Sequence, residues 1–350
     1  MKAAVLEEFQ RPLVVRDVPD PAITAKGAVI RVEANGVCRS DWHAWMGDWD
    51  WLGVNIPLPH VLGHEMSGVV EDVGADVRGF NIGDPVIVPF SQGDGTCPMC
   101  QQGHQNICHN ARMPGFSYWG GFGRYVHIPD ADVNLVRLPE NVGFTEAAAL
   151  GCRFMTAFHG LTDQAEVRAG EWVAVHGCGG VGLSAIQIAT AMGANVIAVD
   201  IADDKLAFAK ELGAVATLNA REVRVAKEIK QLTNGGAHVS VDALGVAATC
   251  QASISSLRRR GRHLQIGMTS RAEQGLIPLP IDVIVNLELR VIGSFGMPVH
   301  RYPQMLQMVS QGRLKPGDLV TSTVPIEEAG RTLQSMNDFT NMGVTVVTDW

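Results

Sequence analysis

The sequence predicts an α/β protein of two domains, one rich in short β-strands and one built on a doubly wound parallel sheet. A length of 350 residues is enough for two domains of ordinary size. The first ~140 residues alternate β-rich runs with Gly, Pro and Asp, a rhythm typical of a small antiparallel barrel or sandwich. From about Thr145 onward, strand patterns alternate with helix patterns, which indicates a parallel sheet covered on both faces.

The β-rich part contains five runs that we expect to form strands: Val29–Ala34, Ser67–Val73, Pro85–Pro89, Gly123–Ile128 and Asp132–Leu138. The tail of the chain predicts two helices and a closing strand: Tyr302–Gln311, Glu327–Met336 and Gly343–Thr348. This tail is too short for a third domain, so we expect it to return to the first one. The predicted domains are therefore residues 1–150 with 296–350, and residues 151–295.

The second part predicts the strands Trp172–His176, Asn195–Val199, Val215–Leu218, His238–Asp242 and Arg262–Gly267. Between them it predicts the helices Val181–Met192, Asp203–Leu212, Glu222–Thr233 and Ala247–Arg258. Each strand except the last is followed by a helix of sufficient length to return the chain to the same end of the sheet, as a parallel arrangement requires.

Composition excludes several classes of partner. A net charge of −8 gives no basic face for nucleic acid, and we expect the run Arg258-Arg259-Arg260 to be the solvated end of a helix. No segment approaches the ~18 uninterrupted apolar residues of a membrane span, and the N-terminus lacks the apolar core of a secretory signal. Three of the seven cysteines fall within residues 97–108. This spacing indicates metal binding in a reducing cytoplasm rather than disulfides.

A glycine-rich turn follows the first strand of the parallel part, where Gly177, Gly179 and Gly182 fill a G-x-G-x-x-G frame. Such a frame allows a tight turn, a close approach of backbone to a pyrophosphate and close packing of the helix that follows. Asp200 ends the next strand, where its carboxylate would accept hydrogen bonds from ribose hydroxyls and repel a 2′-phosphate. The motif therefore predicts NAD as the cofactor. The alternative is that Asp200 only caps the following helix.

Two cysteines and one histidine form a candidate metal site. Cys38, His64 and Cys152 would supply two thiolates and one imidazole, which leaves one tetrahedral position open. An open position is what a catalytic zinc requires and a structural zinc lacks. Each of these residues could instead belong to the core, since spacing along the chain does not show that they converge.

With these motifs, the chain resembles the zinc-containing medium-chain alcohol dehydrogenases over essentially its whole length. The residues that carry the resemblance are Gly36-Val37-Cys38-Arg39-Ser40-Asp41, Gly63-His64-Glu65, Gly120-Gly121-Phe122, Gly151-Cys152, Gly177-x-Gly179-Gly180-x-Gly182, Asp200 and Gly293-Ser294. The resemblance implies a GroES-like catalytic domain built from both chain ends and a Rossmann NAD-binding domain. It also implies reversible hydride transfer between NAD and primary or secondary alcohols.

The resemblance further implies a role for each matched residue. Cys38, His64 and Cys152 would bind the catalytic zinc, with Glu65 behind it as an alternate ligand in some members. The remaining catalytic roles are Asp41 orienting the imidazole of His64, Ser40 accepting the proton of the alcohol, and His43 passing that proton to solvent. The implied cofactor contacts are Arg39 at the pyrophosphate, Thr156 at the nicotinamide ring, and Gly177, Gly179, Gly180, Val181, Gly182, Asp200 and Lys205.

A second, structural zinc is also implied by the resemblance. The family's loop has four cysteines, and its register places Cys97, Cys100 and Cys108 on the last three and Asp94 on the first. A carboxylate oxygen is an acceptable zinc ligand. The alternatives are a loop that holds no metal, or a fourth ligand drawn from His104 or His109.

The residues after the first cysteine are rich in tryptophan. Family members place this loop and the segment before Gly120 around the substrate, so we expect a hydrophobic, partly aromatic pocket for aliphatic or aryl alcohols. Its candidate residues are Trp42, Trp49, Trp51 and Trp119, with Trp45 in the same segment. The alternative for any of them is packing in the core.

Two alternative functions are a polyol or amino-alcohol dehydrogenase of the same family and a nicotinamide-binding protein without catalysis.

The resemblance also implies how the chains assemble. Leu289–Gly293 resembles a strand that pairs between subunits in relatives, and an exposed apolar edge strand needs a partner. The resemblance also implies a homotetramer, the usual state of bacterial members of this length.

Overall fold

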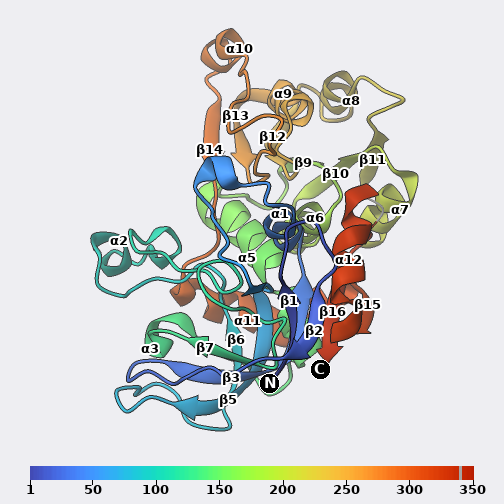
Figure 1. Ribbon diagram of the computed structural model, residues 1–350. Coiled ribbons are helices and arrows are strands. Elements are labelled where there is room, and N and C mark those ends of the chain that lie inside the picture. The colour runs from blue at the N-terminus through green and yellow to red at the C-terminus, as the bar shows by residue number, and fades with distance from the viewer. Residues whose placement is uncertain (339–340) are drawn as a thin grey trace. The chain divides into compact units, whose positions relative to one another are not determined.

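A computed structural model gives the structure of residues 1–338 and 341–350 (Figure 1). The chain forms two compact units, one of Met1–Met155 with Gly296–Trp350 and one of Thr156–Phe295. The first unit therefore contains both ends of the chain.

The first unit is built on two β-sheets. The smaller one has the order β2-β1-β4, and the larger one has the order β15-β16-β3-β5-β6-β8, with β7 also paired to β3. All of these pairs are antiparallel except β15 with β16. The strands are β1 (Lys2–Leu6), β2 (Val14–Asp17), β3 (Ala28–Val37), β4 (His60–Val61), β5 (Glu65–Val73), β6 (Pro85–Val88), β7 (Tyr125–Ile128), β8 (Val136–Arg137), β15 (Val320–Pro325) and β16 (Val344–Asp349).

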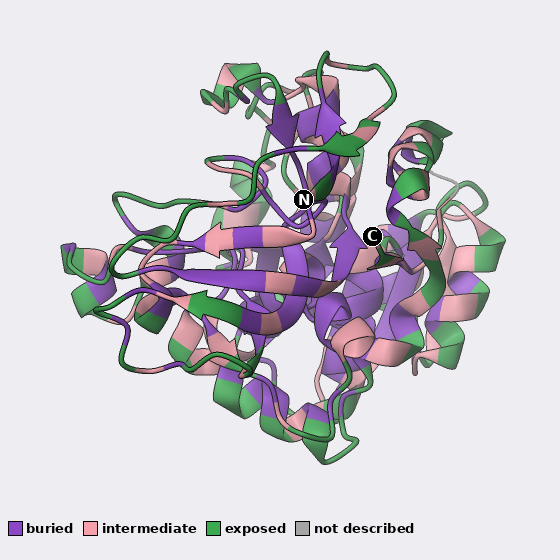
Figure 2. Cartoon of the chain, turned by 60° about the horizontal axis from the view of Figure 1, so that its bottom comes forward, coloured by how far each residue is buried: buried purple, intermediate pink, exposed green. Residues whose placement is uncertain are grey.

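Strand β3 lies at the centre of this unit. Its side chains are buried on both faces, and the strand pairs with β5, β7 and β16. One apolar cluster around Ile30, Met66 and Val126 packs against its first half. Another, around Leu62 and Phe122, lies beside its end. Figure 2 shows buried residues both in the strands and in several helices. The last residue of β3, Val37, directly precedes Cys38, so a rigid strand positions the first candidate ligand.

The helices of the first unit are short: α1 (Arg39–Met46), α2 (Pro98–Gln101), α3 (Ala131–Asn134), α4 (Phe144–Ala149), α11 (Tyr302–Ser310) and α12 (Ala329–Ser335). The predicted strand Asp132–Leu138 is wrong, because α3 occupies its first half and only Val136–Arg137 extend. The side chain of Asn134 explains the difference. Its Nδ2 donates to the carbonyl oxygens of Gly93, Pro129 and Asp130, which closes a helical turn.

The second unit is a single six-stranded parallel sheet with the order β11-β10-β9-β12-β13-β14. Its strands are β9 (Trp172–His176), β10 (Asn195–Asp200), β11 (Ala216–Asn219), β12 (Ala237–Asp242), β13 (Leu257–Gln265) and β14 (Arg290–Gly293). Its helices are α6 (Gly180–Ala191), α7 (Asp203–Glu211), α8 (Val225–Leu232), α9 (Ala247–Ser255) and α10 (Ile281–Asn286), and α5 (Cys152–His159) begins in the first unit. The predicted fold class is confirmed.

The chain order reverses beside β9. From β9 the chain moves outward through β10 and β11, and then returns to the other side of β9 for β12. In open sheets of this kind, ligands bind beyond the carboxyl ends of the strands at such a reversal. The glycine-rich turn after His176 lies there.

The basic run at residues 258–260 belongs to a strand, so its expected place at the end of a helix is wrong. Helix α9 ends at Ser255, and Leu257 is fully buried and pairs with Ala237. The pairing of β12 with β13 then skips from Leu257 to Arg262, and Arg260 has a positive φ of 58°. A bulge therefore carries the arginines outward, and burial of Leu257 overrides their preference for a helix.

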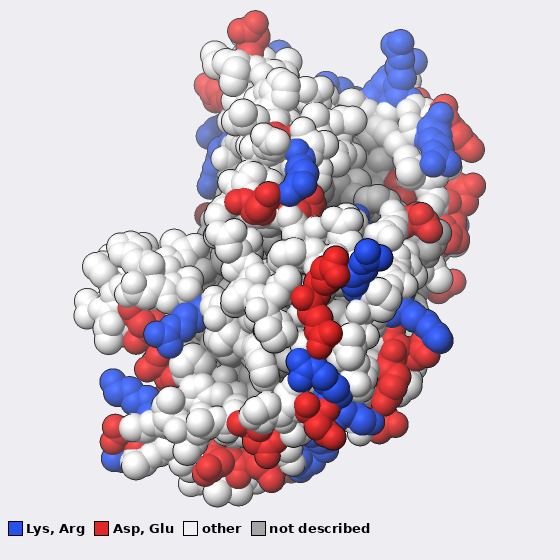
Figure 3. Space-filling view, in the orientation of Figure 1, with Lys and Arg blue, Asp and Glu red and all other residues white. Residues whose placement is uncertain are grey.

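Charged side chains of both signs are interspersed on the face shown in Figure 3, whereas the lobe that carries α2 is almost free of them. Residues 95–111 contain no Asp, Glu, Lys or Arg. Within the part of the chain that the structure describes, no helix has the length and apolar character needed to cross a membrane.

The glycine-rich turn generates a stability prediction. A Cβ atom on Gly182 would lie 1.7 Å from the carbonyl oxygen of Gly177, whereas a Cβ on Gly179 would meet nothing within 4 Å. We expect Gly182→Ala to lower the free energy of unfolding by roughly 1–3 kcal/mol or more, because α6 must move away from β9. Gly179→Ala is the matched control and should change it by less than about 0.5 kcal/mol. Thermal unfolding of the cofactor-free protein measures both, and equal stabilities would contradict the packing described here.

Candidate metal centres and cofactor turn

A buried aspartate organises the first candidate metal centre. Asp41 lies in the first turn of α1 and is fully buried. Its Oδ2 accepts a hydrogen bond of 2.9 Å from the backbone N–H of Cys38. Its Oδ1 accepts from the backbone N–H of Gly63 at 3.0 Å and pairs with Nδ1 of His64 at 2.8 Å. One carboxylate thus connects the start of α1 with the segment before β5.

The hydrogen bond to Asp41 fixes the tautomer of His64. With its proton on Nδ1, the ring presents the lone pair of Nε2. That atom is buried and has no hydrogen-bond partner among the described residues. The rings of Phe90 and Phe116 contact His64 edge-on and restrict its rotation. An unpaired nitrogen held in this way fits a metal ligand.

Four candidate ligands converge here, namely Cys38, His64, Glu65 and Cys152. One ligand atom of each lies within 4.8 Å of the others. The thiol of Cys152 donates to the sulfur of Cys38, which lowers the pKa of Cys38 well below its usual value and raises that of Cys152. Two sulfurs and an imidazole at this separation suit zinc, so the residues present fit the ion.

An ion pair that the sequence analysis missed lies behind these ligands. Arg153 and Glu65 are 6% and 1% exposed. The backbone N–H and the Nε of Arg153 donate to Oε1 of Glu65 at 3.2 and 3.0 Å, and its second terminal nitrogen contacts Oε2. Burial raises the pKa of Glu65 to about 7 against the opposing effect of the guanidinium. Arg153 is the single charge between Ala147 and Phe158, which is the signal that could have revealed it.

The second candidate centre combines Asp94 with Cys97, Cys100 and Cys108, again with all ligand atoms within 4.8 Å. Neither His104 nor His109 belongs to this group. Oδ1 of Asp94 accepts from the backbone N–H groups of Thr96 and Cys97, and Oδ2 accepts from the side-chain amide of Asn110 at 2.7 Å.

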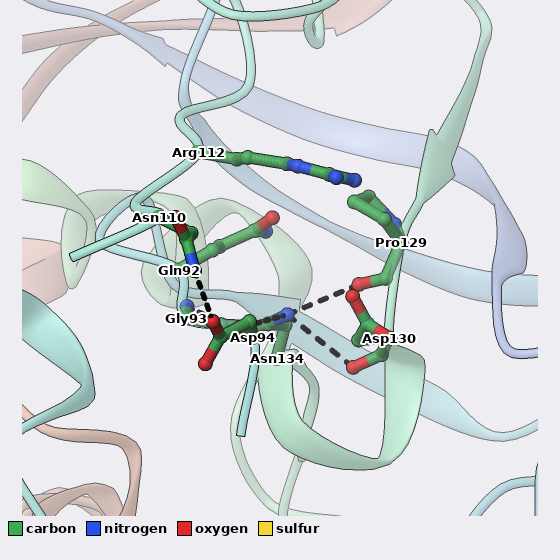
Figure 4. Close-up of a pocket in the computed structure, with 8 residues that line it drawn as sticks. All are labelled: Gln92, Gly93, Asp94, Asn110, Arg112, Pro129, Asp130 and Asn134. Carbon is green, nitrogen blue, oxygen red and sulfur yellow. Dashed lines mark hydrogen bonds between the residues drawn. The ribbon is translucent and has the colours of Figure 1, made fainter. Parts of the chain in front are cut away.

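These donors hold the pKa of Asp94 well below its usual range. Asp94 and Asn110 line a polar cavity of about 240 Å³ (Figure 4). Each carboxylate oxygen can accept more than one partner, so the hydrogen bonds leave capacity for a metal.

The residues expected in the proton path lie near the first centre. The hydroxyl of Ser40 is 3.9 Å from Sγ of Cys38. Nδ1 of His43 pairs with a carboxylate oxygen of Asp48 at 2.7 Å, and its ring stacks on Trp49 with 4.4 Å between centroids. Burial lowers the pKa of His43 despite this carboxylate. Asp48 was missed because a turn beyond the end of α1 brings it back to the ring.

The tryptophans form one apolar region. Trp45 and Trp49 are buried in the cluster beside the end of β3, and Trp42, Trp51 and Trp119 pack against it. Part of this tryptophan-rich segment therefore packs in the core, which is the alternative given for these residues in the sequence analysis. Arg39 stacks over Trp42 at 3.6 Å and donates to the carbonyl of Met336. That a pocket for substrate lies among these rings stays a prediction.

The glycine-rich turn has the features needed for a dinucleotide. Gly177 has a positive φ of 94°, and Gly180 and Val181 open α6 after it. Oδ2 of Asp200 accepts a 2.6 Å hydrogen bond from the N–H of Cys178, and Oδ1 accepts from Ile201 and Ala202. Asp200 therefore braces the turn as well as ending β10, a link that sequence reasoning did not foresee. The open space at Gly179 is where a pyrophosphate would approach the backbone.

Two further predicted cofactor contacts lie in the second unit. Thr156, on α5, is 6% exposed, and its hydroxyl has no hydrogen-bond partner within the described ranges. Lys205 lies in the first turn of α7, the helix that follows Asp200.

Comparison with known proteins agrees with this geometry. Residues 24–140 match the alcohol dehydrogenase GroES-like domain, and residues 180–311 match the zinc-binding dehydrogenase family. An alcohol dehydrogenase of Geobacillus stearothermophilus is 37% identical over 317 residues, which cover 90% of each chain. An NAD-dependent alcohol dehydrogenase of Sulfurisphaera tokodaii is 31% identical over 99% of each chain.

Among solved structures, an alcohol dehydrogenase from Thermus sp. ATN1 superposes with a TM-score of 0.92 at 30% identity, with both chains fully covered. The chain belongs to the zinc-binding, medium-chain alcohol dehydrogenase family. The family predicted from the sequence is confirmed, and the two candidate centres fit two zinc ions per chain.

The two centres generate one prediction with reciprocal controls. We expect Asp41→Asn to weaken metal binding at the first centre by about 10- to 100-fold, because the amide cannot accept from the N–H groups on both sides. Asp94→Ala should instead remove the metal of the second centre, since it deletes a ligand. Elemental analysis after dialysis against a chelator should find one zinc per chain lost in each variant. Loss of both metals, or of neither, would contradict the assignment.

Proposed function

We propose that this zinc-dependent, NAD-linked alcohol dehydrogenase oxidises hydrophobic or aromatic primary and secondary alcohols to aldehydes and ketones, reversibly. The observation that carries the activity is the convergence of Cys38, His64 and Cys152 around an unpaired imidazole nitrogen. The apolar cluster that contains Trp49 and borders Trp42, Trp51 and Trp119 supports the choice of substrate. A polyol would require polar partners for several hydroxyl groups.

The metal-binding roles follow from the two centres. We infer that Cys38, His64 and Cys152 hold the catalytic zinc, and that Asp94, Cys97, Cys100 and Cys108 hold the structural one. A zinc ion supplies Lewis acidity, which lowers the pKa of a bound hydroxyl group toward neutrality. Asp41 orients His64, and Glu65 lies behind the ligands. This set leaves one tetrahedral position for the substrate.

The proton path is assigned to Ser40 and His43. Ser40 accepts the proton of the alcohol and His43 passes it toward solvent. Asp48 supports this order, because its carboxylate holds the Nδ1 proton of His43 and leaves Nε2 to receive another. The lowered pKa of His43 keeps the ring neutral near pH 7, so it can accept.

The cofactor is assigned to the turn after β9. NAD supplies the hydride acceptor. Backbone at Gly177, Gly179, Gly180, Val181 and Gly182 would face the pyrophosphate, and Asp200 would accept from the ribose. Arg39, Thr156 and Lys205 are proposed as further contacts. We accordingly propose residues 1–150 with 296–350 as the catalytic domain and 151–295 as the NAD-binding domain.

Assembly and location are inferred from surface and thiol chemistry. We propose a homotetramer, as the family resemblance implies. Pairing between subunits is supported by β14, an edge strand whose Val291 is 45% exposed, and by Ile281 and Val285 of α10, which are 60% and 68% exposed. An edge strand of this kind favours pairing with another chain.

A cytoplasmic location is proposed because all seven cysteines are free thiols. Cell fractionation tests the location.

The activity is tested by following NADH formation at 340 nm with a panel of primary, secondary, aromatic and polyhydroxy alcohols. We expect the aliphatic and aromatic substrates to have the highest kcat/KM, and preference for a polyol would overturn the substrate assignment.

Ser40→Ala should reduce turnover by about 10²-fold or more, because a positioned proton acceptor is lost. His43→Ala should reduce it less, since water replaces the last member of the path. Full activity in Ser40→Ala would remove Ser40 from the mechanism.

The assembly is tested by sedimentation. Val291→Lys places a charge on the edge of β14 and should yield species smaller than the wild type. Ile82→Lys, at a site that is 64% exposed in a loop of the first unit, is the control and should leave the assembly unchanged. A monomeric wild-type protein would contradict the proposal.

A further inference from the structure

Glu65 lies among the proposed ligands of the catalytic zinc, yet both of its carboxylate oxygens already contact Arg153. Its carboxylate belongs to the same 4.8 Å group as the sulfurs of Cys38 and Cys152. Oε1 accepts two hydrogen bonds from Arg153, and Oε2 contacts a second guanidinium nitrogen of the same residue. A two-pronged contact of this kind between arginine and a carboxylate is among the strongest that side chains make.

The surrounding backbone encloses this pair closely. Gly36 pairs with Glu65 in the β3–β5 ladder. A Cβ on Gly36 would lie 2.4 Å from Oε2 of Glu65 and 3.1 Å from a terminal nitrogen of Arg153. A Cβ on Gly151 would lie 2.5 Å from the Cβ of Glu65. The glycines that precede the two cysteine ligands therefore make room for the ion pair, which is a built part of the centre.

Zinc accepts carboxylate oxygen readily, so an unrestrained Glu65 would compete for the fourth position. A centre with four protein ligands is closed, which is the state of a structural site. If Glu65 moved to the metal, the buried guanidinium of Arg153 would lose its partner. An unpaired buried charge is strongly unfavourable. The ion pair therefore opposes coordination by Glu65.

We propose that Arg153 is a positioning residue that holds Glu65 away from the zinc and thereby keeps the fourth ligand position open for substrate. The proposal rests on the proposed function in one respect, that Cys38, His64 and Cys152 bind the metal. Arg153 itself touches neither metal nor substrate in this role. It acts through Glu65.

The test replaces the zinc of this centre by Co²⁺, after a chelator has emptied it, in the wild type, Arg153→Ala, Arg153→Lys and Arg153→Ala/Glu65→Gln. The visible spectrum of the cobalt reports its ligands and coordination geometry, and added imidazole tests whether the fourth position can be exchanged. In Arg153→Ala we expect the carboxylate of Glu65 to replace a water at the fourth position, so the visible spectrum should change and imidazole should no longer shift it. The cobalt of this variant should also leave to a chelator roughly 10-fold more slowly, a change of the size that neighbours of metal ligands produce.

The other variants separate positioning from folding. Arg153→Lys keeps the charge but offers one contact, so it should show the same changes to a smaller extent, and it serves if Arg153→Ala does not fold. The double variant should return the wild-type spectrum and release rate, because the glutamine amide is a poor zinc ligand. A wild-type spectrum and a wild-type response to imidazole in the Arg153 variants would overturn the proposal. If the wild type binds no cobalt at Cys38, His64 and Cys152, both the proposed function and this inference are wrong. If the wild type binds cobalt and is active, but the Arg153 variants do not differ from it, only this inference is wrong.

Discussion

The proposed catalytic centre depends on the buried carboxylate of Asp41. It accepts from the backbone N–H of Cys38 and of Gly63 while it pairs with His64. Two candidate ligands that are 26 positions apart in the sequence (64 − 38) are thereby held by a single side chain. Because the carboxylate is fully buried, these hydrogen bonds do not compete with water. The position of the imidazole is thus fixed before a metal arrives, which favours binding.

A carboxylate that accepts hydrogen bonds from the backbone is also found beside the second candidate metal centre and in the glycine-rich turn. Asp94 accepts from the backbone N–H groups of Thr96 and Cys97 beside the second metal centre, and Asp200 accepts from Cys178 in the cofactor turn. In each case a carboxylate closes a turn of backbone and offers remaining lone pairs to a ligand. In each place, one residue therefore both stabilises the backbone turn and prepares the candidate site.

Much of the fold could be predicted from the sequence because hydrophobic periodicity and glycine spacing are local signals. The strands β9, β10 and β12 and the turn at Gly177 follow from such patterns. The predictions were wrong where the local structure is determined by packing or hydrogen bonds that a local pattern does not reveal. The side chain of Asn134 turns α3, and burial of Leu257 places the arginines on β13. The candidate ligands were recognised by residue type, but Arg153 and Asp48 were not, because their partners are known only when the chain is folded.

The hydrogen bonds of Asp200 tie its proposed role in cofactor choice to the structure of the glycine-rich turn. Its carboxylate accepts from three backbone N–H groups, those of Cys178, Ile201 and Ala202. A buried N–H left without an acceptor is destabilising by about 1–3 kcal/mol. A redesign toward NADP that only removes this carboxylate would therefore loosen the glycine-rich turn for either dinucleotide. A successful redesign has to supply a new acceptor for the N–H of Cys178 along with a cation for the phosphate.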